Sequence, residues 1–225
     1  MTERAGFNQN YLMTKLFLIS ESVLFPLIAG LVRFRRLGGA YRPFFLMIVC
    51  GALNELVSFI VIKLVHNNAV PTNIESLLEW NLIAWQFFVW GLLQTRRTAF
   101  YVLLSVISLV WVVEDLVFWQ IVSYPPYFSV LYSFLIVLFS VNKINFMITH
   151  DYRKLYGNPI FLICIGFIIY YVYSIIYDWA YQTSLTEPTG ITSDIINLFG
   201  YVNALANVIF AIALLRIPRP QKFTL

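Results

Sequence analysis

Four carboxylates placed inside apolar runs are the residues most able to do chemistry in this sequence. Glu21, Glu55, Glu79 and Asp115 each stand among Leu, Ile, Val, Phe or Trp residues. An ionisable group within a membrane span is costly and commonly marks a ligand or ion site. A carboxylate beside aromatic rings attracts a cation through charge and cation–π interaction. If the apolar runs are membrane spans, these positions predict a site for a cation.

Aromatic and amide side chains at helical spacing extend this set. Tyr173 and Tyr177 are four residues apart, as are Asn203 and Asn207 in the next apolar run. Residues at this spacing share one face of an α-helix. Two structural roles stay open: asparagines suit hydrogen bonds between membrane helices, and tyrosines near helix ends suit an interfacial belt. The pocket that we expect is lined by Glu21, Glu55, Glu79, Asp115, Tyr173, Tyr177 and Asn203.

Adjacent Glu114 and Asp115 require a choice, because neighbours in an α-helix of 3.6 residues per turn point about 100° apart. We expect at most one of them to face the bundle axis. Asp115 is favoured, since Trp111 and Trp119 stand four residues to either side of it.

The elements that must position these residues follow from the composition. Of 225 residues, 60% are hydrophobic and 12% are charged, against about 45–50% and about 25% in soluble domains. A spanning helix needs about 20 apolar residues. The sequence therefore predicts a single all-α membrane domain over residues 1–225, a seven-transmembrane-helix bundle. The expected spans are 12–32, 43–65, 73–93, 99–120, 128–148, 158–180 and 195–215.

Basic residues predict the orientation of this bundle. Lys and Arg gather in alternate connectors, at 33–42, 94–98 and 153–154, and in the tail from Arg216. Cytoplasmic connectors of membrane proteins carry an excess of these residues, so we expect the N-terminus outside and the C-terminus in the cytoplasm. The intramembrane carboxylates then lie between mid-membrane and the outer face, with Lys143 on the inner side. The net charge of +4 is dispersed over helix ends and does not indicate nucleic-acid binding.

The positions of the cysteines and histidines bear on the cellular source of the protein and on whether it can bind zinc. Cys50 and Cys164 fall inside apolar runs and offer no disulfide framework. Together with the lack of an Asn-x-Ser/Thr sequon, this fits a bacterial inner membrane. His66 and His150 belong to opposite faces of the predicted membrane, so they cannot hold one zinc ion, as membrane metallohydrolases require.

Cofactor and enzyme signatures are also missing. Residues 195–215 contain no lysine for a retinal Schiff base, so we expect no covalent retinal and no other cofactor. No Gly-x-Ser-x-Gly elbow or Gly-rich phosphate loop occurs. These patterns do not favour an enzyme.

The first seventy residues carry a resemblance. The stretches at 21–30 (ESVLFPLIAG) and 33–37 (RFRRL), with Arg42-Pro43 and Asn54-Glu55, resemble the start of uncharacterised bacterial seven-helix membrane proteins. The resemblance implies a bacterial membrane protein and brings no activity. The seven-helix plan is also similar to that of rhodopsins and G-protein-coupled receptors, but Gln94-Thr95-Arg96-Arg97 stands where those receptors have Asp-Arg-Tyr.

The leading hypothesis is a receptor-like or sensory membrane protein that binds a small polar or cationic ligand in an outward-facing acidic, aromatic-lined cavity. A separate cytoplasmic or membrane protein would read the bound state. The first alternative is a proton- or cation-coupled transporter or channel. The second is an accessory subunit of a membrane complex, in which the polar stripes are interfaces between chains.

Overall fold

The structure, a computed structural model, describes residues 21–118, 120–150, 155, 157–186 and 189–218; the side chains of Glu21 and Thr186 lie outside this description. Within these ranges all regular structure is helical and no strand occurs. The α-helices are α2 (Leu24–Val32), α3 (Gly38–Val65), α4 (Ala69–Val89), α5 (Arg97–Trp111), α6 (Pro126–His150), α7 (Pro159–Thr186) and α8 (Gly190–Leu215).

Five helical segments are long and apolar enough to cross a membrane, which indicates an integral membrane protein. They are Gly38–Val65, Gln94–Val117, Pro126–His150, Pro159–Leu185 and Gly190–Leu215. The expected span at 73–93 corresponds to α4, which is polar because it carries Glu75 and Glu79. The expected span at 12–32 overlaps α2, which is nine residues long; residues 12–20 of that span lie outside the described residues. The all-helical architecture is thus confirmed for the described residues, with five helices able to cross a membrane, and the count of seven spans stays a prediction.

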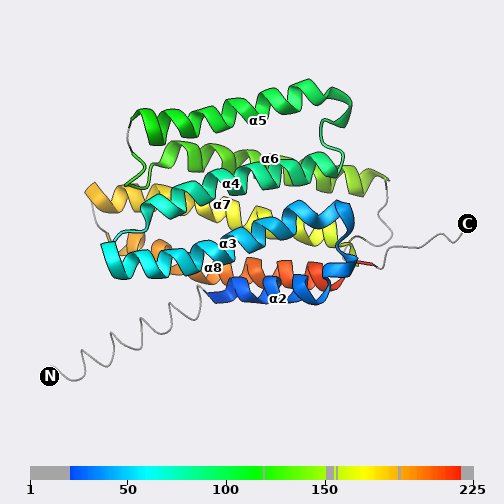
Figure 1. The fold of residues 1–225 in the computed structure, drawn as a ribbon, viewed down its shortest axis with the longest axis horizontal. Coiled ribbons are helices and arrows are strands. Elements are labelled where there is room, and N and C mark those ends of the chain that lie inside the picture. The colour runs from blue at the N-terminus through cyan, green and yellow to red at the C-terminus, as the bar shows by residue number, and fades with distance from the viewer. Residues whose placement is uncertain (1–20, 119, 151–154, 156, 187–188, 219–225) are drawn as a thin grey trace, which may run out of the picture.

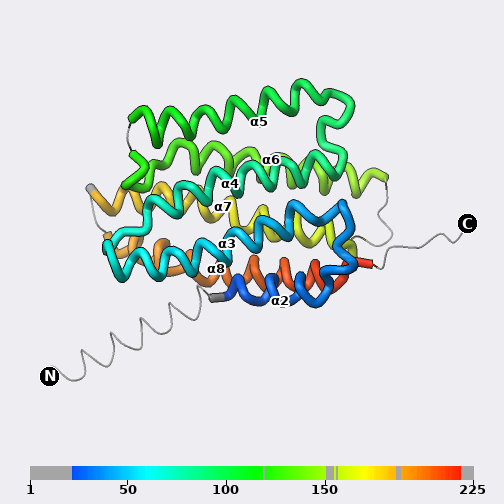
Figure 2. Tube along the Cα trace, viewed as in Figure 1, coloured from blue at the N-terminus to red at the C-terminus, as the bar shows by residue number. Residues whose placement is uncertain are grey.

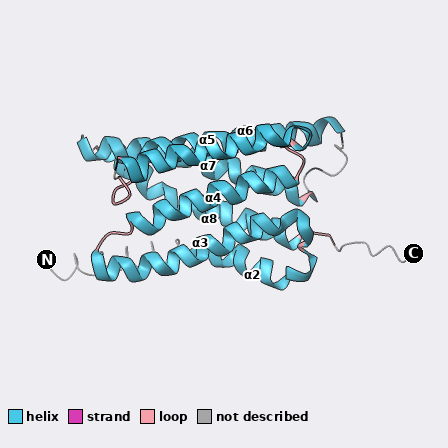
Figure 3. Cartoon of the chain, turned by 45° about the horizontal axis from the view of Figure 1, so that its top comes forward, coloured by secondary structure: helices cyan, strands magenta, loops and turns pink. Residues whose placement is uncertain are grey.

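The helices lie side by side in a bundle, and successive helices run in opposite directions (Figures 1 and 2). Helix α7 packs against α6 and α8, α3 packs against α4, and α2 lies on α8 and α3 (Figure 3). Because the directions alternate, the connectors at 33–37 and 90–96 meet at one end of the bundle, and those at 66–68 and 120–125 meet at the other. We call these the basic end and the acidic end, since the first carries Arg33, Arg35, Arg36, Arg96 and Arg97 and the second lies next to the carboxylates described below.

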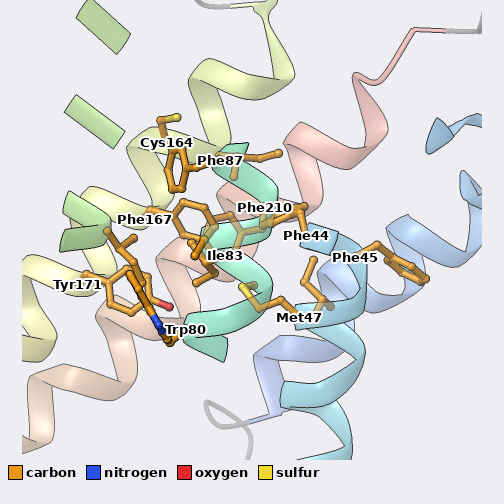
Figure 4. Packing of buried hydrophobic residues seen from close by; sticks show 14 of the residues in the cluster. Phe44, Phe45, Met47, Trp80, Ile83, Phe87, Cys164, Phe167, Tyr171 and Phe210 are labelled. Atoms are coloured by element: carbon orange, nitrogen blue, oxygen red, sulfur yellow. The ribbon is translucent and has the colours of Figure 1, made fainter. Parts of the chain in front are cut away.

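Aromatic side chains fill the middle of the bundle toward the basic end (Figure 4). Ring centroids lie 5.2 Å apart between Phe44 and Phe210, and 5.3 Å apart between Phe167 and Phe210. Phe87 lies 6.0 Å from Phe167. Offset or edge-to-face contacts at these distances are favourable beyond the burial of area. The four rings come from α3, α4, α7 and α8 and close the centre of the bundle.

Gln86 joins α4 to the start of α3 through hydrogen bonds with the backbone. Its Nε2 donates to the Ala40 carbonyl at 2.6 Å, and its Oε1 accepts from the Phe44 N–H at 2.8 Å. Trp90 Nε1 also donates to the Ala40 carbonyl, at 2.9 Å. Pro43 has no N–H and therefore removes one rung from this turn of α3. The wholly buried amide of Gln86 serves two backbone groups beside that gap.

Candidate functional site

A cavity of about 300 Å³ opens between α4, α6, α7 and α8 at the acidic end. Most of the side chains around it are carboxylates, hydroxyls, amides and aromatic rings. None of the described lining residues is Lys, Arg or His. The lining comprises Asn68, Thr72, Asn73, Ser76, Asp115, Tyr124, Pro125, Pro126, Phe128, Ser129, Tyr132, Tyr170, Ser174, Tyr177, Asp178, Tyr181, Gln182 and Phe199. We call this space the outer cavity.

Helix α7 supplies one carboxylate and part of the aromatic wall. Asp178 accepts a hydrogen bond from the Ser129 hydroxyl of α6 at 2.6 Å. The neighbouring Tyr177 stacks on Phe199 of α8, with centroids 4.4 Å apart, and Tyr181 follows it at 6.1 Å. Because residues three and four apart share a helix face, this one stripe of α7 presents a negative group beside aromatic rings.

The connector at 120–125 is tied down over the same end of the bundle. The Tyr124 hydroxyl donates to Asn68 Oδ1 at 2.5 Å, and the Tyr124 carbonyl accepts from Gln182 Nε2 at 2.9 Å. Burial, with Tyr181 close by, raises the pKa of the Tyr124 phenol. The phenol therefore remains a neutral donor at physiological pH, and it fixes the connector to α4 while Gln182 fixes it to α7.

Asp115 lies on a π-helical turn, η4 (Val112–Val117), which continues α5. Glu114 and Asp115 are both buried, at 5% and 1% exposure. Only Asp115 lines the outer cavity, whereas Glu114 borders a groove between α5 and the start of α6. A π-turn widens the helix and changes the angle between successive side chains, which the 3.6-residue repeat does not anticipate. Trp119, which favoured Asp115 in the sequence, lies outside the described residues.

Glu114 and Asp115 have different hydrogen-bond partners. Glu114 accepts the N–H groups of Tyr127 and Phe128, at 3.0 and 2.7 Å, and so caps the start of α6. Asp115 lines the outer cavity, and its Oδ1 has no hydrogen-bond partner among the described residues.

A second cavity of about 120 Å³ lies deeper, and we call it the inner cavity. Three carboxylates line it: Glu55 from α3 and Glu75 and Glu79 from α4. Glu75 accepts a hydrogen bond from Asn54 Nδ2, and Glu79 accepts one from the Tyr132 hydroxyl at 3.0 Å. Glu75 is also within electrostatic reach of both other carboxylates.

The inner and outer cavities are neighbours. Tyr170 lines both, and Tyr132 lines the outer cavity while donating to Glu79 of the inner one. On the far wall, Asn207 Nδ2 donates to Ser22 Oγ at 2.9 Å and to Asn203 Oδ1 at 3.1 Å. Tyrosine side chains therefore separate the two groups of carboxylates, and one of them, Tyr132, donates a hydrogen bond to Glu79 on the inner side.

The seven residues expected in a single pocket do not share one cavity. Glu55, Glu79 and Asn203 line the inner cavity, whereas Asp115 and Tyr177 line the outer one. Tyr173 lines neither, because its hydroxyl donates to the Ile195 carbonyl at 2.9 Å. The side chain of Glu21 lies outside the described part of the structure. Asn207 also makes the hydrogen bond between helical segments that was the alternative for it, through Ser22, whereas Asn203 accepts a bond from Asn207 within α8 itself.

Sequence reasoning left out several lining residues. Glu75 was visible as the residue one turn before Glu79, and Asp178 as the neighbour of Tyr177. Tyr132 had no such signal: it stands in α6 without a charged residue one turn away, and only the packing of α6 against α4 brings it to Glu79. Contacts between helices far apart in sequence are not encoded in the periodicity of either helix.

No described lining residue of either cavity is basic, although Lys63 and His66 lie at the same end of the bundle. Lys143 donates to the Trp90 carbonyl at 2.5 Å, near the C-terminus of α4, where a cation is favoured by the helix dipole. Among the described residues, no three His, Cys, Asp or Glu side chains converge as metal ligands. The acidic cavities thus lack a counter-ion from any described lining residue.

Comparison of the chain with protein-family models, with curated proteins and with solved structures finds no match.

Proposed function

We propose that this chain is a receptor-like membrane protein that binds a small organic cation in the outer cavity. The observation that carries the proposal is the lining: two carboxylates, Asp115 and Asp178, face a space whose other walls combine aromatic rings with hydroxyl and amide groups, with no described basic residue on it. Aromatic faces and carboxylates together attract organic cations. A volume of about 300 Å³ is at the lower end of the range for small-molecule pockets.

The orientation belongs to the same proposal. With the basic end in the cytoplasm, the outer cavity faces outside, in a bacterial inner membrane. A ligand would then reach Asp178 and Tyr181 without crossing the bilayer. The bound state would alter the packing of α6 on α7, since Ser129 and Asp178 join these helices at the cavity wall. A cytoplasmic or membrane partner would read that change.

The aromatic core that lies beyond the inner cavity favours binding of a cation over its conduction. Phe44, Phe87, Phe167 and Phe210 pack ring against ring there. A cation path requires polar groups or water along its length, because an unsolvated charge in an apolar interior is very costly. Among the described residues, these rings stand between the inner cavity and Lys143, which supports binding over conduction.

Calorimetry on the protein in lipid nanodiscs tests the proposal. We expect butylamine and tetramethylammonium to bind, and the neutral isosteres butanol and neopentane not to bind. Asp178→Asn should weaken butylamine binding at least about tenfold, which is the effect of roughly 1.4 kcal/mol. Equal heats for the charged and neutral members of each pair would overturn the proposal.

Cation-coupled transport is the second candidate, and the inner cavity favours it. Glu55, Glu75 and Glu79 continue the acidic lining of the outer cavity toward mid-bundle, joined to it through Tyr132 and Tyr170. Intramembrane carboxylates of this kind occur in proton relays. Uptake of radiolabelled butylamine into proteoliposomes, driven by an imposed pH gradient and lost in Glu79→Gln, would support transport. Binding without uptake would support the receptor.

A further inference from the structure

Asp115 is a buried carboxylate that the fold does not satisfy. It is 1% exposed, and its Oδ1 has no hydrogen-bond partner among the described residues. Its neighbour Glu114 shows the contrast, because that carboxylate receives two backbone N–H groups. Buried polar groups in native proteins are nearly always paired, and an exception calls for an explanation. A ligand that donates hydrogen bonds into the outer cavity would supply the missing partner.

Asp178 is a second carboxylate on the same cavity, contributed by a different helix. Its described partner is the neutral hydroxyl of Ser129, which satisfies one acceptor site but adds no positive charge. A carboxylate has room for about four donors. The cavity therefore presents two acceptor groups, one on η4 and one on α7, and no described cation to balance them.

Charge balance then decides the class of ligand. A single ammonium group compensates one carboxylate and leaves the other buried and uncompensated, which is strongly unfavourable. A ligand with two ammonium groups compensates both. A divalent metal ion is the other dication, but the described residues hold no cluster of three metal-ligating side chains, and the aromatic walls suit a hydrocarbon chain between two charged ends.

We propose that the outer cavity takes a short linear diamine, with one ammonium group bound at Asp115 and the other at Asp178. The hydrocarbon linker lies against Tyr177 and Phe199, whose rings stack 4.4 Å apart on the cavity wall. This inference rests on the proposed function and specifies its ligand.

Paired ligands of equal chain length provide the test. Binding of diaminobutane and butylamine to the protein in nanodiscs is compared by calorimetry, at constant pH and ionic strength. We expect diaminobutane to bind at least about tenfold more tightly than butylamine. Equal affinities for the two amines would overturn the diamine inference and leave the cation receptor standing. Absence of binding by either amine would overturn both.

Two variants assign the two ends of the ligand. Asp115→Asn and Asp178→Asn each leave one carboxylate, so each should reduce the preference for diaminobutane over butylamine to less than about threefold. Both substitutions are mild for the fold: Asp115 Oδ1 loses no bond, and in Asp178→Asn the introduced amide oxygen can still accept from Ser129. Thermal unfolding checks that each variant is folded.

Asp194→Asn is the matched control. It removes the same charge from the acidic end, near the start of α8, but Asp194 is exposed and lies outside the cavity lining. The preference for diaminobutane should remain at about tenfold or more in this variant. A loss of preference in Asp194→Asn as large as in Asp178→Asn would show that general surface charge causes it, and would contradict the proposed contacts.

Discussion

At the residue scale, the adjacent carboxylates Glu114 and Asp115 have different roles: the first stabilises the fold and the second lines the outer cavity. Glu114 holds the first turn of α6 through two hydrogen bonds to backbone N–H groups. Asp115 has a free acceptor among the described residues and faces a cavity. The sequence predicts that Asp115 faces inward. It does not predict that Glu114 is buried as well, because a π-turn is not apparent in a 3.6-residue repeat.

This difference yields a prediction about stability. Glu114→Ala leaves the buried Phe128 N–H and the partly buried Tyr127 N–H without this acceptor. It should lower the free energy of unfolding by about 2–3 kcal/mol, given charge-assisted bonds of roughly 1.5–3 kcal/mol. Asp115→Asn breaks no hydrogen bond of Oδ1, so it should change that free energy by less than about 0.5 kcal/mol. Reversible unfolding in detergent micelles, followed by circular dichroism, measures both. A larger loss for Asp115→Asn than for Glu114→Ala would contradict the assignment.

At the element scale, α4 supplies two of the three carboxylates of the inner cavity and the amide that joins it to α3. Glu75, Glu79 and Gln86 belong to one stripe of this helix, which the sequence spacing indicates. The lengths of the apolar runs also predict a helix near each of the seven expected spans. It misses the start of α3, expected at Pro43 and found at Gly38, because Gln86 and Trp90 support the turn that contains the proline. Such support from another helix is a tertiary effect and leaves no mark in the local pattern.

Gln86 provides the prediction at this scale. Gln86→Ala removes bonds to the Ala40 carbonyl and the Phe44 N–H and opens a cavity in a wholly buried place, so it should cost about 2–4 kcal/mol of unfolding free energy. Gln94→Ala is the matched control, because Gln94 is exposed and its bonds to Phe88 and Val89 carbonyls compete with water. It should cost less than about 0.5 kcal/mol. Similar losses for both variants would show that the α3–α4 link is not a principal contact.

At the scale of the whole molecule, charge is sorted along the bundle axis. Arginines occupy the connectors of one end, carboxylates line cavities toward the other, and an aromatic core lies between. The sequence indicates this sorting, since alternate connectors carry the basic residues. It could not indicate two cavities instead of one, because that depends on Tyr132 and Tyr170 standing between them. Glu55 and Glu79 come from the neighbouring helices α3 and α4. Asp115 of η4 and Tyr177 of α7 line one cavity because α6 packs against both α5 and α7.

The central claim, an outward-facing cavity that selects cations, is tested most directly by charge-selective thiol labelling on intact cells. Ser174→Cys places a thiol on the cavity lining, one turn from Asp178, and the unmodified Cys50 is first changed to Ser. Two membrane-impermeant methanethiosulfonates are compared, one with a trimethylammonium group and one with a sulfonate group. Ser123→Cys, in an exposed connector at the same end of the bundle, is the control and should react with both reagents.

We expect the cationic reagent to modify Ser174→Cys at least about tenfold faster than the anionic one, after correction for their rates with a free thiol. Butylamine should slow that reaction and leave the Ser123→Cys reaction unchanged. Equal rates for the two reagents at Ser174→Cys, or labelling that begins only after the cells are permeabilised, would contradict the account.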